Sequence, residues 1–135
     1  MKNILYVLIP SFIAYAGFIG AIVSEIIKKN KYFRLKIVVF FSLIVALLIF
    51  DFPIYKDMID KNTNTVIAEY VQFQSSNTLP CTRKAFFKSE NGEFYVYVPI
   101  FTRDIAKIEI GKTYEVEYFC NSRVIKEYNL IEQHE

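Results

Sequence analysis

The sequence predicts an α + β fold made of two membrane-spanning helices followed by a small β domain. Three observations support this prediction. Hydrophobic residues make up 53% of the 135 residues and concentrate in the first 55. A basic stretch divides that apolar segment in two, and the period of the apolar residues changes from helical to two beyond residue 64. So much apolar surface needs burial, which excludes a chain that is mainly disordered.

The first apolar run, Ile4–Ser24, contains 21 residues without a charge. A helix of this length is about 30 Å long, which is the thickness of the hydrocarbon core of a bilayer. Pro10 lies inside the run, and membrane helices tolerate such a kink. We therefore expect a spanning helix over about residues 4–27. The alternative is a signal peptide cleaved after Ala14-Tyr15-Ala16, although cleavage there would leave an apolar segment behind.

The second apolar run begins at Ile37 and reaches Phe50. If Asp51 lies at the far membrane interface, Phe52–Tyr55 extend the run to a span over about residues 35–55. The intervening loop, residues 28–36, carries five positive charges. Since basic residues in short loops stay on the cytoplasmic side, we expect residues 1–55 to form a transmembrane hairpin in the cell membrane. Both termini are then extracytoplasmic.

Small residues recur every three or four positions along one face of the first helix. They are Ser11, Ala14, Gly17, Ala21 and Ser24. Such stripes allow helix backbones to approach closely in lipid. We expect this stripe to pack the hairpin of the chain itself; the alternative is a homo-oligomer or a partner helix.

The remainder of the chain predicts a short stalk at residues 56–64 and an extracytoplasmic β domain at residues 65–135. The expected strands are Thr65–Phe73, Arg83–Ser89, Glu93–Val98, Thr113–Cys120 and Arg123–Ile131. Asn91-Gly92 is a strong hairpin signal between the second and third strands. Thr102–Ile108 has a helix N-cap candidate and could form one or two helical turns. A helix between the third and fourth of five strands resembles the element order of an OB-type β-barrel, with an SH3-like barrel as the alternative.

Two cysteines, Cys81 and Cys120, fall in the part of the chain expected outside the cell, where disulfides persist. A bond between them would close a loop of about 40 residues and stabilise the fold by roughly 3–4 kcal/mol. Two unpaired thiols are the alternative, because spacing in sequence does not bring the sulfur atoms together. Both interpretations stay open at this point.

Several classes of function have no support in the sequence. His134, the single histidine, is the second-to-last residue of the sequence, and no phosphate-binding glycine loop occurs. We therefore expect no enzyme, and no catalytic, cofactor-binding or metal-binding residues. Residues 61–135 contain nine Lys and Arg against ten Asp and Glu, which argues against nucleic acid. Tyr95 and Tyr97 point to one side of their strand and are candidates for a surface that binds a protein partner.

These features together favour a small bacterial membrane protein that displays a β-barrel outside the cell. Its expected partners are the lipid bilayer and another envelope protein or a secreted protein, bound without catalysis. One alternative is an immunity protein that protects against a secreted toxin or bacteriocin. The other is an accessory subunit of a larger membrane complex.

Overall fold

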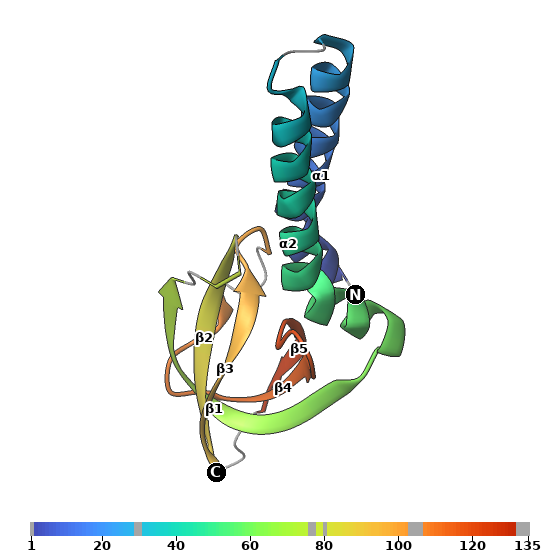
Figure 1. The fold of residues 1–135 in the computed structure, drawn as a ribbon. Helices are drawn as coiled ribbons and strands as arrows, with labels where there is room; N and C mark the ends of the chain where they lie inside the picture. The colour runs from blue at the N-terminus through green and yellow to red at the C-terminus, as the bar shows by residue number, and fades with distance from the viewer. Residues whose placement is uncertain (1, 29–30, 76–77, 80, 103–106, 132–135) are drawn as a thin grey trace.

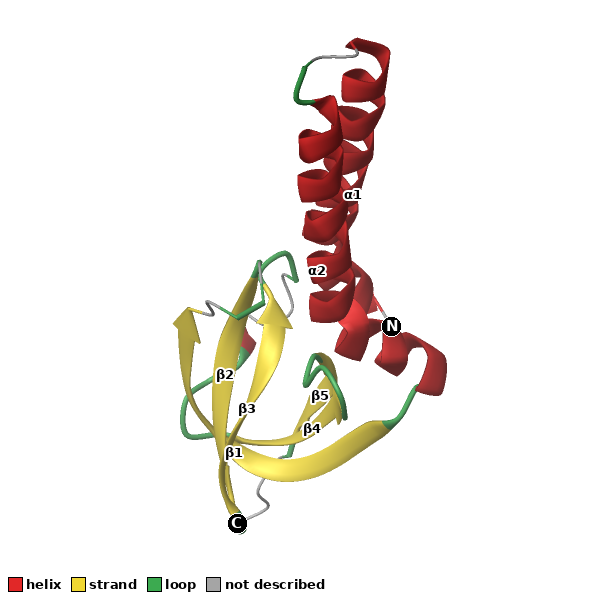
Figure 2. Cartoon of the chain, viewed as in Figure 1, coloured by secondary structure: helices red, strands yellow, loops and turns green. Residues whose placement is uncertain are grey.

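The computed structural model consists of a long helix hairpin that stands on a small β domain (Figures 1 and 2). The residues that it describes are 2–28, 31–75, 78–79, 81–102 and 107–131. The two helices come first in the chain, and the five strands follow. Helix α1 begins beside the β domain, and the described chain ends, after β5, on the side of that domain away from the hairpin (Figure 1).

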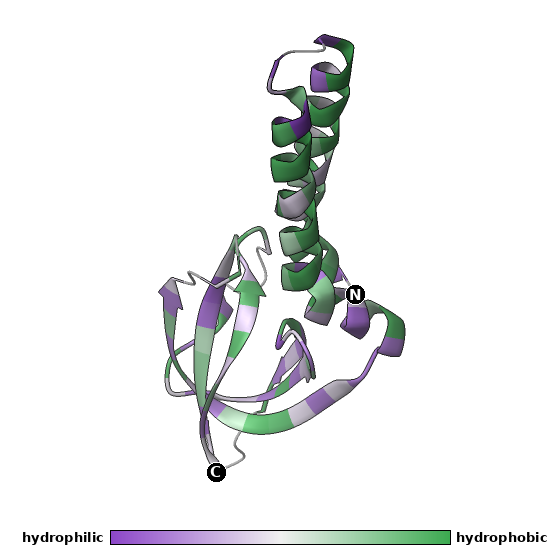
Figure 3. Ribbon diagram, viewed as in Figure 1, coloured by the Kyte–Doolittle hydropathy of each residue, from purple (hydrophilic) through white to green (hydrophobic). Residues whose placement is uncertain are grey.

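Helices α1 (Lys2–Lys28) and α2 (Phe33–Asp60) form the hairpin. Within the described residues, these two helices are long and apolar enough to cross a membrane. Figure 3 shows apolar residues along both helices, and many of their side chains are open to the surroundings, including Ile13 (69% exposed) and Ile49 (70% exposed). A core helix of a water-soluble protein would instead bury such side chains. Helix α2 continues to Asp60, so most of the segment that the sequence predicts as a stalk is helical.

Polar contacts join α1 to α2 at both ends of the hairpin. Near the β domain, the carboxylate of Asp51 accepts hydrogen bonds from the Ser11 hydroxyl (3.0 Å) and the Tyr15 hydroxyl (3.2 Å). Near the loop, Lys36 forms an ion pair of 3.2 Å with Glu25. Asp51 is 1% exposed and its carboxylate is turned toward α1, while its expected place at the far membrane interface stays a prediction. Its two hydroxyl donors replace the water that an exposed carboxylate would need.

The β domain is a five-stranded antiparallel open sheet with the order β3-β2-β1-β4-β5. The strands are β1 (Thr63–Ser75), β2 (Thr82–Ser89), β3 (Gly92–Pro99), β4 (Thr113–Phe119) and β5 (Ile125–Leu130). The first half of β1 pairs with β4 and the second half with β2, and Glu69 takes part in both ladders. A register shift between Tyr70 and Gln72 marks a bulge, which bends the strand where it changes partner. One long bent strand therefore serves both halves of the sheet.

The concave side of this bent sheet encloses the main apolar core. Its fully buried members alternate along the strands, as the period of two requires. They include Ala85, Phe87, Val96, Val116 and Ile125. The Phe87 ring stacks on Phe94 at 5.7 Å and meets Tyr70 edge-on at 5.5 Å. Aromatic side chains thus fill much of the small interior.

All five expected strands are present, with ends shifted by two residues or fewer. The hairpin between β2 and β3 is also present, but Glu90 and Asn91 form its turn, and Gly92 opens β3 with φ of +119°. Only glycine adopts that angle readily, which is why the Asn-Gly signal still identifies the hairpin. The helix expected at Thr102–Ile108 falls largely on residues 103–106, outside the described residues.

The two edge strands of the sheet approach each other at one point. An isolated parallel bridge joins Tyr97 of β3 to Val124, just before β5. There the backbone N–H of Tyr97 donates to the carbonyl of Arg123 at 2.8 Å. The sheet is therefore curled so far that its two edge strands, β3 and β5, approach each other.

Candidate interaction site

The hairpin and the β domain share a second apolar cluster, which we call the junction cluster. Residues from both helices meet residues from the sheet and its loops, and all of them are 8% exposed or less. The helices contribute Ile4, Val7, Leu8 and Ile54, and the β domain contributes Leu79, Tyr97, Phe119 and Val124. Burial of each large apolar side chain contributes roughly 1.5–3 kcal/mol. The hairpin is therefore packed onto the domain rather than joined to it by a flexible tether.

A polar clamp reinforces the junction cluster. The Asp57 carboxylate of α2 is completely buried and accepts three hydrogen bonds from the turn between β4 and β5. The donors are the backbone N–H of Asn121 (3.0 Å), its side-chain amide (2.6 Å) and the backbone N–H of Ser122 (2.6 Å). On α1, the side-chain amide of Asn3 donates to the Ile125 carbonyl at 2.9 Å. Both helices are thus tied to the last hairpin of the sheet.

The two tyrosines predicted for partner binding have different surroundings. Tyr97 is 7% exposed and belongs to the junction cluster, so its ring faces the helices. Tyr95 is half-buried and lies beside it, with an edge-on ring contact of 5.6 Å. Of the pair, only Tyr95 offers appreciable surface to a partner.

Two cations and a third aromatic ring surround Tyr95. We call this set, Phe86, Tyr95, Tyr97, Lys84 and Arg123, the aromatic–cation strip. The Lys84 ammonium lies 4.7 Å from the centre of the Tyr95 ring, and the Arg123 guanidinium carbon lies 5.1 Å from it. The Phe86 and Tyr95 rings are 5.9 Å apart. The strip therefore begins at the junction cluster and continues along β2 and β3.

The strip combines aromatic surface with positive charge. Within the described ranges, Lys84 and Arg123 have no ion pair with a carboxylate, so their N–H groups can bind an incoming acid. Ring contacts already orient both cations, which reduces the entropy lost on binding. Aromatic rings and arginine are the side chains that contribute most at protein interfaces. The chemistry of the strip fits a partner that presents carboxylates next to apolar groups.

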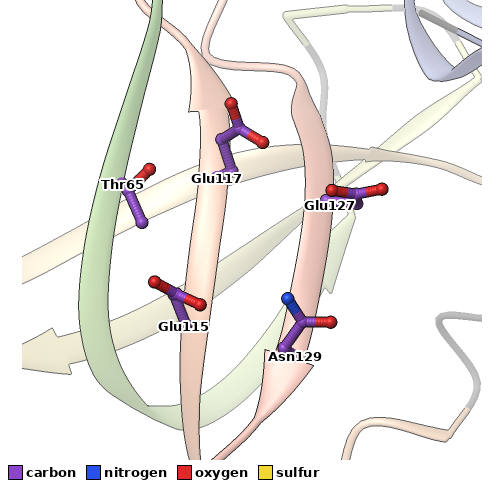
Figure 4. A pocket seen from close by; sticks show the side chains of 5 residues that line it. All are labelled: Thr65, Glu115, Glu117, Glu127 and Asn129. Carbon is purple, nitrogen blue, oxygen red and sulfur yellow. The ribbon is translucent and has the colours of Figure 1, made fainter.

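A shallow polar groove of about 250 Å³ lies on the opposite half of the sheet, over β1, β4 and β5 (Figure 4). Its lining residues are Thr65, Glu115, Glu117, Glu127 and Asn129. Glu117 accepts hydrogen bonds from Lys126 (2.8 Å) and Thr63 (2.6 Å), and these two bonds lower the pKa of its carboxyl. Among the described residues, no group of three or more His, Cys, Asp or Glu is arranged to hold a metal ion. The groove is a solvated acidic face, as the alternation of Glu115 and Glu117 indicates.

Cys81 and Cys120 are free thiols in the structure. Cys81 precedes β2 in a left-handed conformation with φ of +56°, and its carbonyl accepts from the Ile100 N–H at 2.9 Å. Cys120 follows β4 and is exposed, and its N–H donates to the Asn62 carbonyl at 3.1 Å. The disulfide stays a prediction for the oxidised protein.

The stripe of small residues on α1 is divided between two environments. Ser11 is buried against α2, and Ala14, Ala21 and Ser24 are partly buried. Gly17 is exposed, and a methyl group added there would meet nothing within 4 Å. Part of the stripe therefore packs the hairpin of the chain itself, and Gly17 lies on a face that α2 leaves open.

Sequence reasoning did not find Asp57 or the cations of the strip. Asp57 sits in a polar segment, where one buried carboxylate looks like its exposed neighbours. Lys84 and Arg123 are far apart in sequence and meet only because β3 touches the start of β5. Side chains alternate between the two faces of β2, so Lys84 could have been assigned to the same face of the sheet as Tyr95 if the pairing register of β2 and β3 had been known. Comparisons with protein-family models, curated proteins and solved structures found no match to this chain.

Proposed function

We propose that this chain is an integral membrane protein of the cell envelope that presents its β domain to another protein outside the cell, without catalysing a reaction. The rigid junction between hairpin and domain carries the proposal. A domain that serves only as a soluble binder needs no fixed orientation, whereas this one is held by the Asp57 clamp and the junction cluster. Such packing sets the direction in which the aromatic–cation strip faces.

The basic loop between the helices supports the orientation. Lys28, Lys31 and Arg34 are exposed at the end of the hairpin farthest from the β domain. Retention of this loop in the cytoplasm puts the domain and both termini outside. Labelling of intact cells with a membrane-impermeant maleimide tests this topology. With Cys81→Ser in place, Cys120 is labelled, whereas a Lys31→Cys variant that lacks both native cysteines is labelled only after lysis.

We further propose that the domain is an OB-like barrel. The parallel bridge between Tyr97 and Val124 supports this class, since a partly open barrel brings the two edge strands of its sheet together. Hydrogen exchange of the Tyr97 amide is the test. Slow exchange, like that of amides inside the antiparallel ladders, supports the barrel, and rapid exchange favours an open sheet.

The test of partner binding uses the full-length protein in its native membrane. A photo-crosslinking residue replaces Tyr95 in one variant and Asn129, on the acidic groove, in the control. We expect a cross-linked product of defined mass from position 95 only. Lys84→Glu together with Arg123→Glu should remove that product without loss of the folded protein. A product that forms equally from both positions, or survives the charge reversal, contradicts the proposal.

An accessory subunit of a membrane complex is the second candidate, and one observation favours it. Ala16, Gly17 and Gly20 are exposed on α1, and the two glycines have open space where a side chain would be. Small residues of this kind let a further helix approach closely. Gly17→Leu with Gly20→Leu should then split a larger complex extracted in mild detergent, while cross-linking at position 95 continues.

A further inference from the structure

We propose that the loop after β3 inserts into the outer leaflet of the membrane that anchors the chain. The loop is a tight turn from Pro99 to Thr102, in which both the backbone N–H and the hydroxyl of Thr102 donate to the Pro99 carbonyl (3.3 and 2.7 Å). Ile100 and Phe101 occupy the two corners of the turn. Their side chains are 51% and 59% exposed.

The residues at these corners are unusual for a turn in water. Turn corners commonly carry Gly, Pro, Asn, Asp or Ser, because those residues suit the backbone angles and remain hydrated. Two adjacent large apolar side chains at an exposed apex expose surface that costs free energy in water. An apolar medium around the apex removes that cost.

The position of the turn beside α2 indicates that the apolar medium around it is lipid. Figure 1 shows that β3 runs toward the hairpin and that the loop after it rises beside the lower turns of α2. Tyr97 of β3 and Leu79 line a crevice together with Phe50, Pro53 and Ile54 of α2. Tyr97 is therefore level with this part of α2 along the helix axis. Ile100 lies three residues beyond Tyr97, a reach of about 10 Å along a strand. The apex is thus at the level of the last apolar turns of α2, which would lie among the lipid acyl chains if α2 spans the membrane.

The charges next to the apex suit the headgroup layer. The described segments at this end of the domain, residues 81–85, 96–102 and 121–124, contain only basic charges: Arg83, Lys84 and Arg123. Arg83 is exposed and pairs in register with Val98, two residues below the apex. An apolar tip with cations just behind it is the arrangement by which proteins bind the interface of a bilayer that contains anionic lipid.

This inference rests on the proposed membrane span, and one experiment separates the two. The chain contains no tryptophan, so each single tryptophan variant reports from one place. Full-length Phe101→Trp, Ile110→Trp and Phe41→Trp proteins are placed in vesicles of phosphatidylcholine and phosphatidylglycerol, with and without bromine on the acyl chains. Phe41 is exposed on α2, and Ile110 is exposed in the segment before β4. Figure 1 shows that segment on the side of the domain away from the hairpin.

We expect brominated lipid to quench the emission of Phe101→Trp and Phe41→Trp several-fold more strongly than that of Ile110→Trp. Quenching of Phe41→Trp without quenching of Phe101→Trp overturns the inference and leaves the membrane span intact. A blue-shifted but unquenched Phe101→Trp also overturns it, because a protein, such as a second copy, then covers the apex. If Phe41→Trp itself is unquenched, the membrane span fails.

Discussion

The carboxylate of Asp57 in α2 accepts a hydrogen bond of 2.6 Å from the backbone N–H of Ser122 in the turn between β4 and β5. Asn121 supplies two further donors to the same carboxylate. This cluster connects the last turns of α2 with a turn more than 60 residues later in the chain. It is therefore the most direct place to test how the two parts of the molecule are coupled.

Asp57→Ala should lower the free energy of unfolding by about 1–3 kcal/mol, since it leaves the buried N–H of Ser122 and the two partly buried donors of Asn121 without an acceptor. Urea unfolding of the full-length protein in detergent, followed by circular dichroism, measures the change. Asp60→Ala is the matched control, because Asp60 is exposed in the same helix. An equal effect of the two substitutions would show that the clamp contributes nothing.

Asp51→Leu should destabilise the hairpin by about 1–3 kcal/mol, because the buried hydroxyl of Ser11 and the hydroxyl of Tyr15 lose their acceptor. Asp51→Asn keeps an acceptor oxygen and should cost less. The unfolding of α1 and α2 in a denaturing detergent gives the comparison. If Asp51→Leu is as stable as the native chain, packing alone holds the helices together.

We expect the ionised carboxylate of Glu117 to make a pH-dependent contribution to the stability of the folded state. The bonds from Lys126 and Thr63 hold the pKa of its carboxyl below the ordinary value of 4.5, so the folded state favours the ionised form. The contribution is complete above that ordinary value and is lost as the pH falls through the lowered pKa. Because the pair is partly exposed, it amounts to only about 0.5 kcal/mol.

Thermal unfolding of native and Glu117→Gln proteins at neutral and acid pH measures this contribution. The two proteins should differ at neutral pH and converge in acid. Glu127→Gln is the contrast, since Glu127 lies directly opposite Glu117 and its removal relieves a repulsion between like charges. A difference between native and Glu117→Gln proteins that persists in acid would point to a cause other than ionisation.

Removal of the helices should impair the β domain. A fragment of residues 62–135 would expose Leu79, Tyr97, Phe119 and Val124, which the helices now cover. An exposed patch of this kind drives association. We expect the fragment to bind a hydrophobic dye and to self-associate on light scattering, unlike the full-length protein in detergent. A monomeric fragment that unfolds cooperatively and leaves the dye unbound would contradict the role given to the junction cluster.

The hairpin and the strands could be predicted from the sequence because local patterns determine them. The charge-free run from Ile4 and the alternation of Tyr114, Val116 and Tyr118 each depend on neighbouring residues alone. The ends of elements were less certain: α2 continues through Asp57 and Asp60 because contacts with the domain stabilise polar turns that hydropathy assigns to a stalk.

Long-range contacts explain what the sequence did not reveal. The sequence did not reveal what holds Asp51, because the hydroxyls that bind it belong to α1, 36 and 40 residues earlier. Tyr95 and Tyr97 lie on one face of β3, as predicted, but nothing local indicates that the helices cover Tyr97. Those facts depend on the packing of hairpin against sheet, for which one sequence contains no periodic signal.

Only Lys61 and Asn62 separate the end of α2 from the start of β1. Two residues of fully extended chain span at most about 7 Å, so the domain has almost no freedom to move away from the helices or to swivel on them. On the proposed membrane span, the domain is then held at one fixed distance from the bilayer. Any molecule that recognises this domain must bind it at that fixed distance from the membrane surface. A partner protein anchored in the same membrane can hold its binding surface at that distance, whereas a soluble partner has to approach the membrane to make contact.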